Sequence, residues 1–151
     1  MNARKLFFIL IVSVLVFGSI SGVSSALFLD FLDDTAKQPD TNVSIVGINF
    51  TIPAGYEESK VNNSTDEYGI VTVNHIYAGP EDIIDISVLY NGPVDKFEVL
   101  DKKHSPTTIA GKDGMYASAD KYYNFVYKQD DKMVSIVARN QSIVEKVISG
   151  K

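Results

Sequence analysis

The chain opens with its longest apolar stretch, which has no polar periodicity. Two basic residues, Arg4 and Lys5, precede the apolar run LFFILIVSVLVF at 6–17, and no further charge follows until Asp30. A basic start, an apolar core of this length and small residues before Ala26 are typical of a signal peptide that is cut after Ala26. The whole uncharged run is also long enough to span a bilayer as a hydrophobic helix. Cleavage and retention as an anchor both stay open.

Either fate of this segment places the remaining chain on the same side of the membrane. Arg4 and Lys5 hold the N-terminus in the cytoplasm, so the rest is exported. The sequence predicts three parts: 1–26 as signal peptide or membrane anchor, 27–42 as an acidic, turn-rich linker, and 43–151 as one folded domain. The predicted location is outside the cytoplasmic membrane, either anchored by the N-terminal helix or secreted to the cell surface.

Apolar and polar positions alternate with a period of two through much of the predicted domain, which is the pattern of half-buried strands. The clearest unit is a β-hairpin of YYNFVYK at 122–128 and MVSIVARN at 133–140, joined by the polar turn 129–132. The other predicted strands cover 43–52, 70–77, 84–90 and two short pieces within 107–118. Gly47 marks a turn or bulge within the first of them, and 111–114 form a turn or bulge between the two short pieces. The polar segment 57–67 is predicted as a loop.

Two segments have helical periodicity instead. Between Pro93 and Ser105, apolar residues recur at helical spacing and predict a short middle helix. Near the end of the chain, a capping box of Ser142 and Glu145 precedes an apolar stripe, and Gly150 ends the predicted C-terminal helix. The predicted fold class is α+β, with a single curved antiparallel sheet of five to seven strands and the short middle helix. The C-terminal helix packs on one sheet face, and an N-terminal hydrophobic helix comes first.

Composition excludes several classes of function. The chain has no cysteine, so disulfides, thiolate catalysis and zinc fingers are excluded. Its formal net charge of -5 leaves no basic surface that neutralises a run of phosphates, so we expect no nucleic-acid partner. We also expect no cofactor and no metal.

Five tripeptides fit the acceptor pattern for N-glycosylation, where about one is expected by chance. They begin at Asn42, Asn49, Asn62, Asn63 and Asn140. Asn49 is the weakest candidate because it lies within a predicted strand, and Asn62 and Asn63 cannot both be modified easily. The other four are candidate glycosylation sites, although Asn, Ser and Thr are also common in loops.

The remaining candidate chemistry is sparse. His75 and His104 are the two histidines, and neither has a partner at motif spacing, so we interpret them as a strand residue and a loop residue. Acidic residues gather at 33–34, 81–85 and 130–131 without the spacing of a calcium loop. We interpret these groups as solvated turns, with weak calcium binding as the alternative.

Aromatic residues concentrate in the predicted strands near the C-terminus. The candidate binding face consists of Tyr116, Tyr123, Phe125 and Tyr127. Aromatic side chains on one sheet face can line a groove for a glycan, a peptide or a lipid. They more often form half of a hydrophobic core, with the phenol groups at its rim.

Two stretches resemble exported proteins. The segment GINFTIPAGY at 47–56 is similar to the start of small, largely uncharacterised exported archaeal proteins. The tail from Ile109 to Ile148 resembles a DUF4367-type domain of bacterial and archaeal envelope proteins, in which a Gly-containing strand, an aromatic hairpin and a short final helix follow one another. The resemblance implies the fold of this part and brings no functional residue.

Export, acceptor sites, aromatic strands and the lack of a catalytic motif predict a non-enzymatic cell-envelope module. It would bind an envelope protein or a surface polymer such as a glycan through a sheet face, and the cytoplasmic membrane through the N-terminal segment if that segment is uncleaved. The alternative is an accessory carrier or chaperone that holds an apolar ligand between sheet and helix. An acid–base hydrolase comes third, because it needs two carboxylates, or one carboxylate and His75, to converge in a cleft.

Intact-mass spectrometry of the protein from native membrane and soluble fractions tests export. We expect a chain that begins near Leu27 outside the cell, or a chain that retains Met1 or Asn2 and is found only with membranes. Recovery of the full-length chain from the soluble cytoplasm would contradict both alternatives.

Overall fold

The computed structural model describes residues 39–92, 104–119 and 121–150. They belong to a compact unit that begins at Lys37. The predicted signal or anchor, most of the predicted linker and the predicted middle helix lie outside the described residues. Among the described residues, no helix is both long and apolar enough to cross a membrane.

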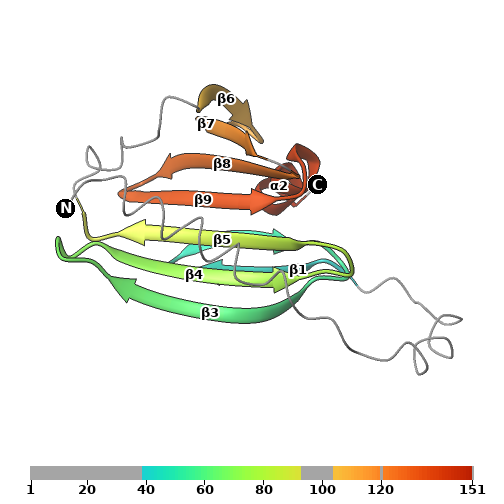
Figure 1. Ribbon diagram of the computed structural model, residues 1–151, viewed down its shortest axis with the longest axis horizontal. Coiled ribbons are helices and arrows are strands. Elements are labelled where there is room, and N and C mark those ends of the chain that lie inside the picture. The colour runs from blue at the N-terminus through green and yellow to red at the C-terminus, as the bar shows by residue number, and fades with distance from the viewer. Residues whose placement is uncertain (1–38, 93–103, 120, 151) are drawn as a thin grey trace, which may run out of the picture. The chain divides into compact units, whose positions relative to one another are not determined.

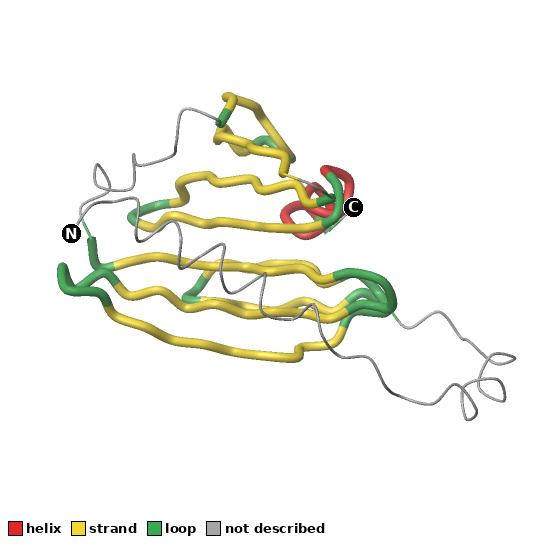
Figure 2. The backbone as a smooth tube through the Cα atoms, in the orientation of Figure 1, coloured by secondary structure: helices red, strands yellow, loops and turns green. Residues whose placement is uncertain are grey.

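The described chain is built from antiparallel strands and a C-terminal helix (Figures 1 and 2). The elements are β1 (Thr41–Ile45), β2 (Ile48–Ile52), β3 (Glu57–Thr65), β4 (Val71–Ala78), β5 (Ile83–Tyr90), β6 (Ser105–Ile109), β7 (Lys112–Ala119), β8 (Tyr122–Gln129), β9 (Lys132–Ala138) and α2 (Gln141–Ser149). β1 and β2 form a two-stranded sheet, and the other strands form a 7-stranded sheet of order β3-β4-β5-β9-β8-β7-β6.

The predicted α+β class with a single sheet was wrong, because the described chain is mostly β and has two sheets. The segment 57–67, predicted as a polar loop, contains the nine-residue strand β3. The segment 43–52, predicted as strand with a turn or bulge at Gly47, lies in the β1–β2 hairpin, whose turn is at Val46 and Gly47. Val46 and Gly47 both take positive φ angles, of 51° and 79°, which is the backbone of a two-residue hairpin turn.

The β1–β2 hairpin and α2 pack on the same face of the 7-stranded sheet, which we call the covered face. All three contribute to one hydrophobic cluster whose members are 0–3% exposed. The hairpin contributes Ile45, Ile48, Phe50 and Ile52, the helix contributes Val144 and Val147, and the sheet contributes Tyr77, Ile84, Ile86, Val88, Ile109, Phe125, Tyr127, Val134, Ile136 and Ala138. Because strand residues alternate between faces, the apolar half of each central strand enters this core.

The helix is capped at both ends, although not by the predicted capping box. Asn140 has an extended backbone, and its side-chain oxygen accepts a hydrogen bond from the backbone N–H of Ile143 at 3.1 Å. At the other end Gly150 takes a left-handed φ of 69° and donates its N–H to the carbonyl of Lys146 at 2.8 Å. The N-cap is therefore Asn140, two residues before the Ser142 that the sequence pattern favoured, and the helix begins at Gln141.

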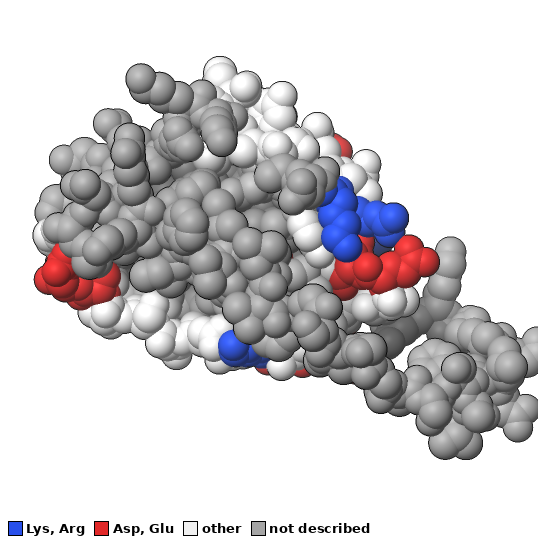
Figure 3. Space-filling model, viewed as in Figure 1, with Lys and Arg blue, Asp and Glu red and all other residues white. Residues whose placement is uncertain are grey.

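Polar contacts join the loops at one end of the 7-stranded sheet. The Tyr56 hydroxyl donates to Asp82 at 2.5 Å, and Arg139 donates to Glu81 at 2.9 Å. Basic and acidic side chains lie side by side at this end of the molecule (Figure 3). These contacts connect the loop after β2, the β4–β5 turn and the segment before α2, so they fix the ends of elements that the core already holds together.

Gly114 lies inside β7, although the sequence pattern suggested a turn there. The turn between β6 and β7 consists of Ala110 and Gly111, both at positive φ. At Gly114 a Cβ atom would collide with the carbonyl oxygen of Val126 and would lie 2.8 Å from the ring of Phe125. The glycine therefore makes room for an aromatic ring on the neighbouring strand.

Two valines of opposite exposure test the packing of the covered face. Val134 is fully buried, at 0% exposure, whereas Val61 is 46% exposed. We expect Val134→Ala to lower the free energy of unfolding by about 2–3 kcal/mol, because it removes buried methyl groups and leaves a cavity. The matched variant Val61→Ala should change it by less than about 0.5 kcal/mol. Urea denaturation measures both, and equal losses would contradict this assignment of the core.

Candidate functional site

The face of the 7-stranded sheet opposite the covered face carries a row of polar side chains, which we call the polar ladder. Residues paired directly across antiparallel strands point to the same face, and the pairs Asn62↔Asn74, Asn74↔Ser87 and Ser87↔Ser135 continue from strand to strand. The ladder consists of Asn62, Asn74, Asp85, Ser87, Asn124 and Ser135.

The side chains of the polar ladder bond to one another. Asn74 accepts from the amide of Asn62 at 3.2 Å and donates to Asp85 at 2.5 Å and to Ser87 at 3.0 Å. Ser135 donates to Asn124 at 3.1 Å. Asp85 and Ser87 are only 2% and 1% exposed, so these bonds replace the water that the polar atoms lose on folding. Asp85, Ser87 and Ser135 of the ladder are buried, whereas Asn62, Asn74 and Asn124 are half-buried.

Asp85 is the titratable group of this ladder. Burial raises the pKa of its carboxyl to about 6, and the hydrogen bonds from Asn74 and Ser87 oppose that rise. The interpretation of the acidic residues at 81–85 as a solvated turn was wrong for Asp85, because it lies in β5 and points into the protein. Asp130 and Asp131 are exposed in the β8–β9 turn, as the sequence predicted.

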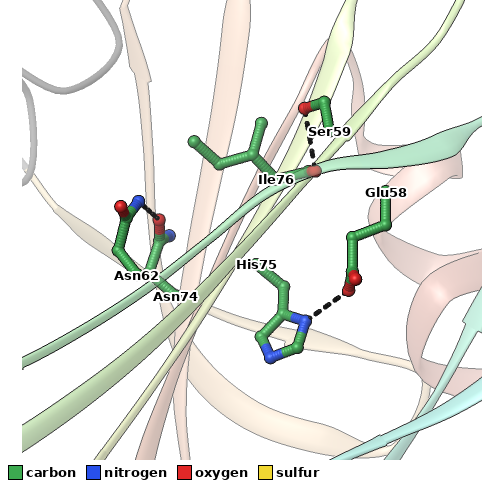
Figure 4. A network of polar contacts seen from close by, with 6 residues as sticks. All are labelled: Glu58, Ser59, Asn62, Asn74, His75 and Ile76. Carbon is green, nitrogen blue, oxygen red and sulfur yellow. Dashed lines mark hydrogen bonds and ion pairs between the residues drawn. The ribbon is translucent and has the colours of Figure 1, made fainter.

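A histidine–carboxylate pair lies where β3 meets β4. His75 Nδ1 is 2.6 Å from Glu58 Oε1, and their side chains are 19% and 48% exposed. The two residues come from neighbouring strands and lie away from Asn62 and Asn74 (Figure 4). The His75 ring stacks on Tyr77 with centroids 6.3 Å apart. Sequence spacing gave no sign of this pair, because it depends on the β3–β4 register.

The His75–Glu58 pair has the first two members of a hydrolytic triad, but the structure gives it no nucleophile. A triad needs a hydroxyl or thiol bonded to the second imidazole nitrogen. The nearby Ser59 hydroxyl donates instead to the carbonyl of Ile76 at 3.0 Å. In the described part of the chain, no group of three or more His, Cys, Asp and Glu residues is arranged to hold a metal ion. The pair is therefore best described as a polar contact at the side of the sheet.

Tyr77 lies beneath this pair in the core. Burial, and after it the negative charge of Glu58, raise the pKa of the Tyr77 phenol to about 12. Its hydroxyl is buried and has no well-oriented hydrogen-bond partner among the described residues, although Glu58 is near enough to affect its pKa. The phenol therefore stays neutral at physiological pH.

The aromatic residues of the candidate binding face all belong to the covered face. Phe125 is fully buried and Tyr127 is 3% exposed, and their rings stack at 5.5 Å. Tyr116 and Tyr123 are half-buried at the rim of the core and stack at 5.2 Å with an angle of 7° between the rings. A ligand on this face would therefore meet Tyr116 and Tyr123 only.

The candidate glycosylation sites differ in accessibility. Asn42, Asn63 and Asn140 are exposed, whereas Asn62 is half-buried and its amide nitrogen donates to Asn74. Asn42 accepts from the hydroxyl of Thr51 at 2.9 Å, and Asn140 caps α2 through its oxygen, so both leave the amide nitrogen available for a glycan. Asn49, the weakest candidate from sequence, is also exposed. The other histidine, His104, is buried directly before β6.

The buried carboxyl of Asp85 predicts a dependence of stability on pH. Its pKa rises from 3.8 in the unfolded chain to about 6 in the folded protein, so the folded state binds the proton more tightly. Raising the pH from about 4 to about 6 should therefore lower the free energy of unfolding, by on the order of 3 kcal/mol in total. This loss of stability is complete above about pH 6 and absent below about pH 4.

The variant Asp85→Asn removes the titrating group and keeps the acceptor oxygen for Asn74. We expect it to be more stable than the natural protein at pH 7 and to lack the loss of stability between about pH 4 and about pH 6. Denaturation in urea over a pH series measures this, with Asp130→Asn in the exposed turn as the control. An unchanged pH profile in Asp85→Asn would show that another group causes the dependence.

Compared with models of protein families, with curated proteins and with solved structures, the chain gives no significant match. The similarity to small exported archaeal proteins and to a DUF4367-type domain stays a prediction from the sequence. What the protein does must therefore be inferred from its own surfaces.

Proposed function

We propose that the chain is an exported, non-enzymatic module of the cell envelope that binds a partner at the open side of its 7-stranded sheet, along β3 and β4. The exposure of β3 carries this proposal. Eight of its nine residues are exposed, whereas the central strands β5 and β9 are largely buried. Val61 in β3 and Tyr68 in the following turn are 46% and 56% exposed, the large exposed hydrophobic residues of the described chain.

Export is supported by the apolar N-terminal run, which follows Arg4 and Lys5, and by the glycosylation acceptor pattern. Asn42 and Asn140 are exposed and lie outside β3, which is consistent with their modification outside the membrane. A surface polymer is the second class of partner, and it would reach Tyr116 and Tyr123 at the rim of the core. The open strand favours a protein partner, because its free groups are those of a polypeptide backbone.

The alternative, a carrier for an apolar ligand, is less well supported by the geometry. The space between the sheet, the β1–β2 hairpin and α2 contains side chains that are 0–3% exposed. A ligand in that space would have to displace residues such as Phe50 and Phe125, which are among the largest fully buried side chains. Such displacement costs more than occupation of a preformed pocket, which is what carriers provide.

Site-specific photo-cross-linking in the native envelope tests the proposed function. A photo-reactive amino acid at Val61 should form an adduct with a partner protein, because this exposed position lies at the open side of β3. The matched control is the exposed position Thr108 in β6, at the other edge of the same sheet. Equal adducts at both positions, or none at Val61, would contradict a binding surface at β3.

A further inference from the structure

We propose that the partner docks as an additional β-strand on the free edge of β3 and that it is an extended protein segment with basic residues near both ends. The proposal rests on the proposed function and specifies the chemistry of its partner. It follows from three observations on β3: its open edge, its interrupted register and the charges at its two ends.

β3 is the terminal strand of the 7-stranded sheet and pairs with β4 alone (Figure 1). In an antiparallel ladder, alternate residues direct their N–H and C=O groups to opposite sides of the strand. About four residues of this strand therefore direct backbone donors and acceptors away from β4. Such a row of groups is the template on which an extended chain adds as a further strand.

The opposite edge of the sheet is a poorer template. β6 has five residues, Ser105–Ile109, against nine in β3. It includes Pro106, which has no backbone N–H and a fixed φ. β3 contains no proline, so every residue along it has a backbone N–H.

One irregularity limits where a partner strand can pair. The β3–β4 register skips Ser59, between Glu58 and Lys60, and the Ser59 hydroxyl donates to the carbonyl of Ile76. This bulge changes the direction of the backbone groups at the start of β3. The regular part of the edge is therefore Lys60–Thr65, and a docking strand would pair with these residues.

Negative charges lie at both ends of this regular stretch. Glu57 and Glu58 precede it, Asp66 and Glu67 follow it, and Lys60 is the basic residue among them. Four acidic residues and one lysine give 57–67 a formal charge of -3. Acidic side chains gather at the end of the molecule where the β3–β4 turn lies (Figure 3). Charge complementarity therefore favours a partner segment with basic residues at both ends.

The same charges argue against a second copy of this chain as the occupant. If two β3 strands paired antiparallel along Lys60–Thr65, the acidic residues that precede this stretch in one copy would lie next to Asp66 and Glu67 of the other. Like charges on facing positions of neighbouring strands are destabilising. The two-fold symmetry of such a pair repeats the repulsion at the other end. A different protein with the opposite charge avoids it.

Binding of designed peptides to the full-length chain in detergent tests the proposal. The first peptide alternates Thr and Val and has two lysines at each end, and its control has glutamates in place of the lysines. A third peptide keeps the lysines but has N-methylated backbone amides, which cannot donate hydrogen bonds to an edge. Fluorescence anisotropy should show saturable binding of the first peptide only. Hydrogen exchange should then show slower exchange within Lys60–Thr65.

A charge-reversal variant provides the matched test on the protein. Glu57 and Glu67 are both exposed, so Glu57→Lys with Glu67→Lys should leave the fold intact. We expect this variant to bind the lysine-ended peptide about three- to tenfold more weakly and the glutamate-ended peptide more tightly. Asp113→Lys with Glu145→Lys makes the same change of net charge at exposed positions elsewhere and should bind like the natural protein.

The outcomes separate this proposal from the proposed function. A partner cross-linked at Val61, together with no slowing of exchange in Lys60–Thr65, would overturn strand addition and leave the binding module standing. If no partner is cross-linked at Val61 and exchange in Lys60–Thr65 is not slowed, both the proposed binding module and strand addition are overturned. A dimer with slow exchange in Lys60–Thr65 before any peptide is added would assign the edge to a second copy and overturn the charged partner. A glycan on Asn62 or Asn63 in the native protein would also overturn it, because a glycan there covers the edge.

Discussion

The structure depends on the burial of one continuous apolar surface between the covered face of the 7-stranded sheet, the β1–β2 hairpin and α2. With no cysteine in the chain, no disulfide supports this packing. The hairpin and the helix lie at opposite ends of the described sequence, so neither has a core until both meet the sheet. The positive φ of Val46, which is unfavourable for a β-branched residue, is tolerated because it turns Ile45 and Ile48 into this core.

The opposite face is organised by a different constraint, which is the need to satisfy buried polar groups. Asn74 in β4 bonds to Asn62 in β3 and to Asp85 and Ser87 in β5, so one amide joins the side chains of two neighbouring strands. A partly buried ladder of this kind specifies strand register, because a shift by one residue would separate each polar atom from its partner. The raised pKa of Asp85 is the cost of this arrangement, since a buried carboxylate is less well stabilised than a solvated one.

The sequence predicted the elements that have a regular pattern and missed those that do not. The hairpin of β8 and β9 alternates over its whole length, and α2 has a clear apolar stripe, so both were found from local residues. β3 was missed because it is exposed on both faces, so no alternation marks it and only pairing with β4 makes it a strand. The His75–Glu58 pair and the polar ladder were missed for a related reason, because both depend on the register between strands that no local pattern contains.

The exposure of β3, which kept it from being predicted as a strand, also bears on function. A strand whose side chains face solvent on both sides contributes little to the core, yet β3 is as long as any strand in the described sheet. Sheet proteins usually protect such an edge by shortening it or by adding proline, as β6 does here. β3 has its bulge at one end, at Ser59, and acidic residues at both ends, so the backbone groups of Lys60–Thr65 between them stay open. Open hydrogen-bonding groups flanked by acidic side chains are the features on which the proposed docking of a segment with basic residues rests.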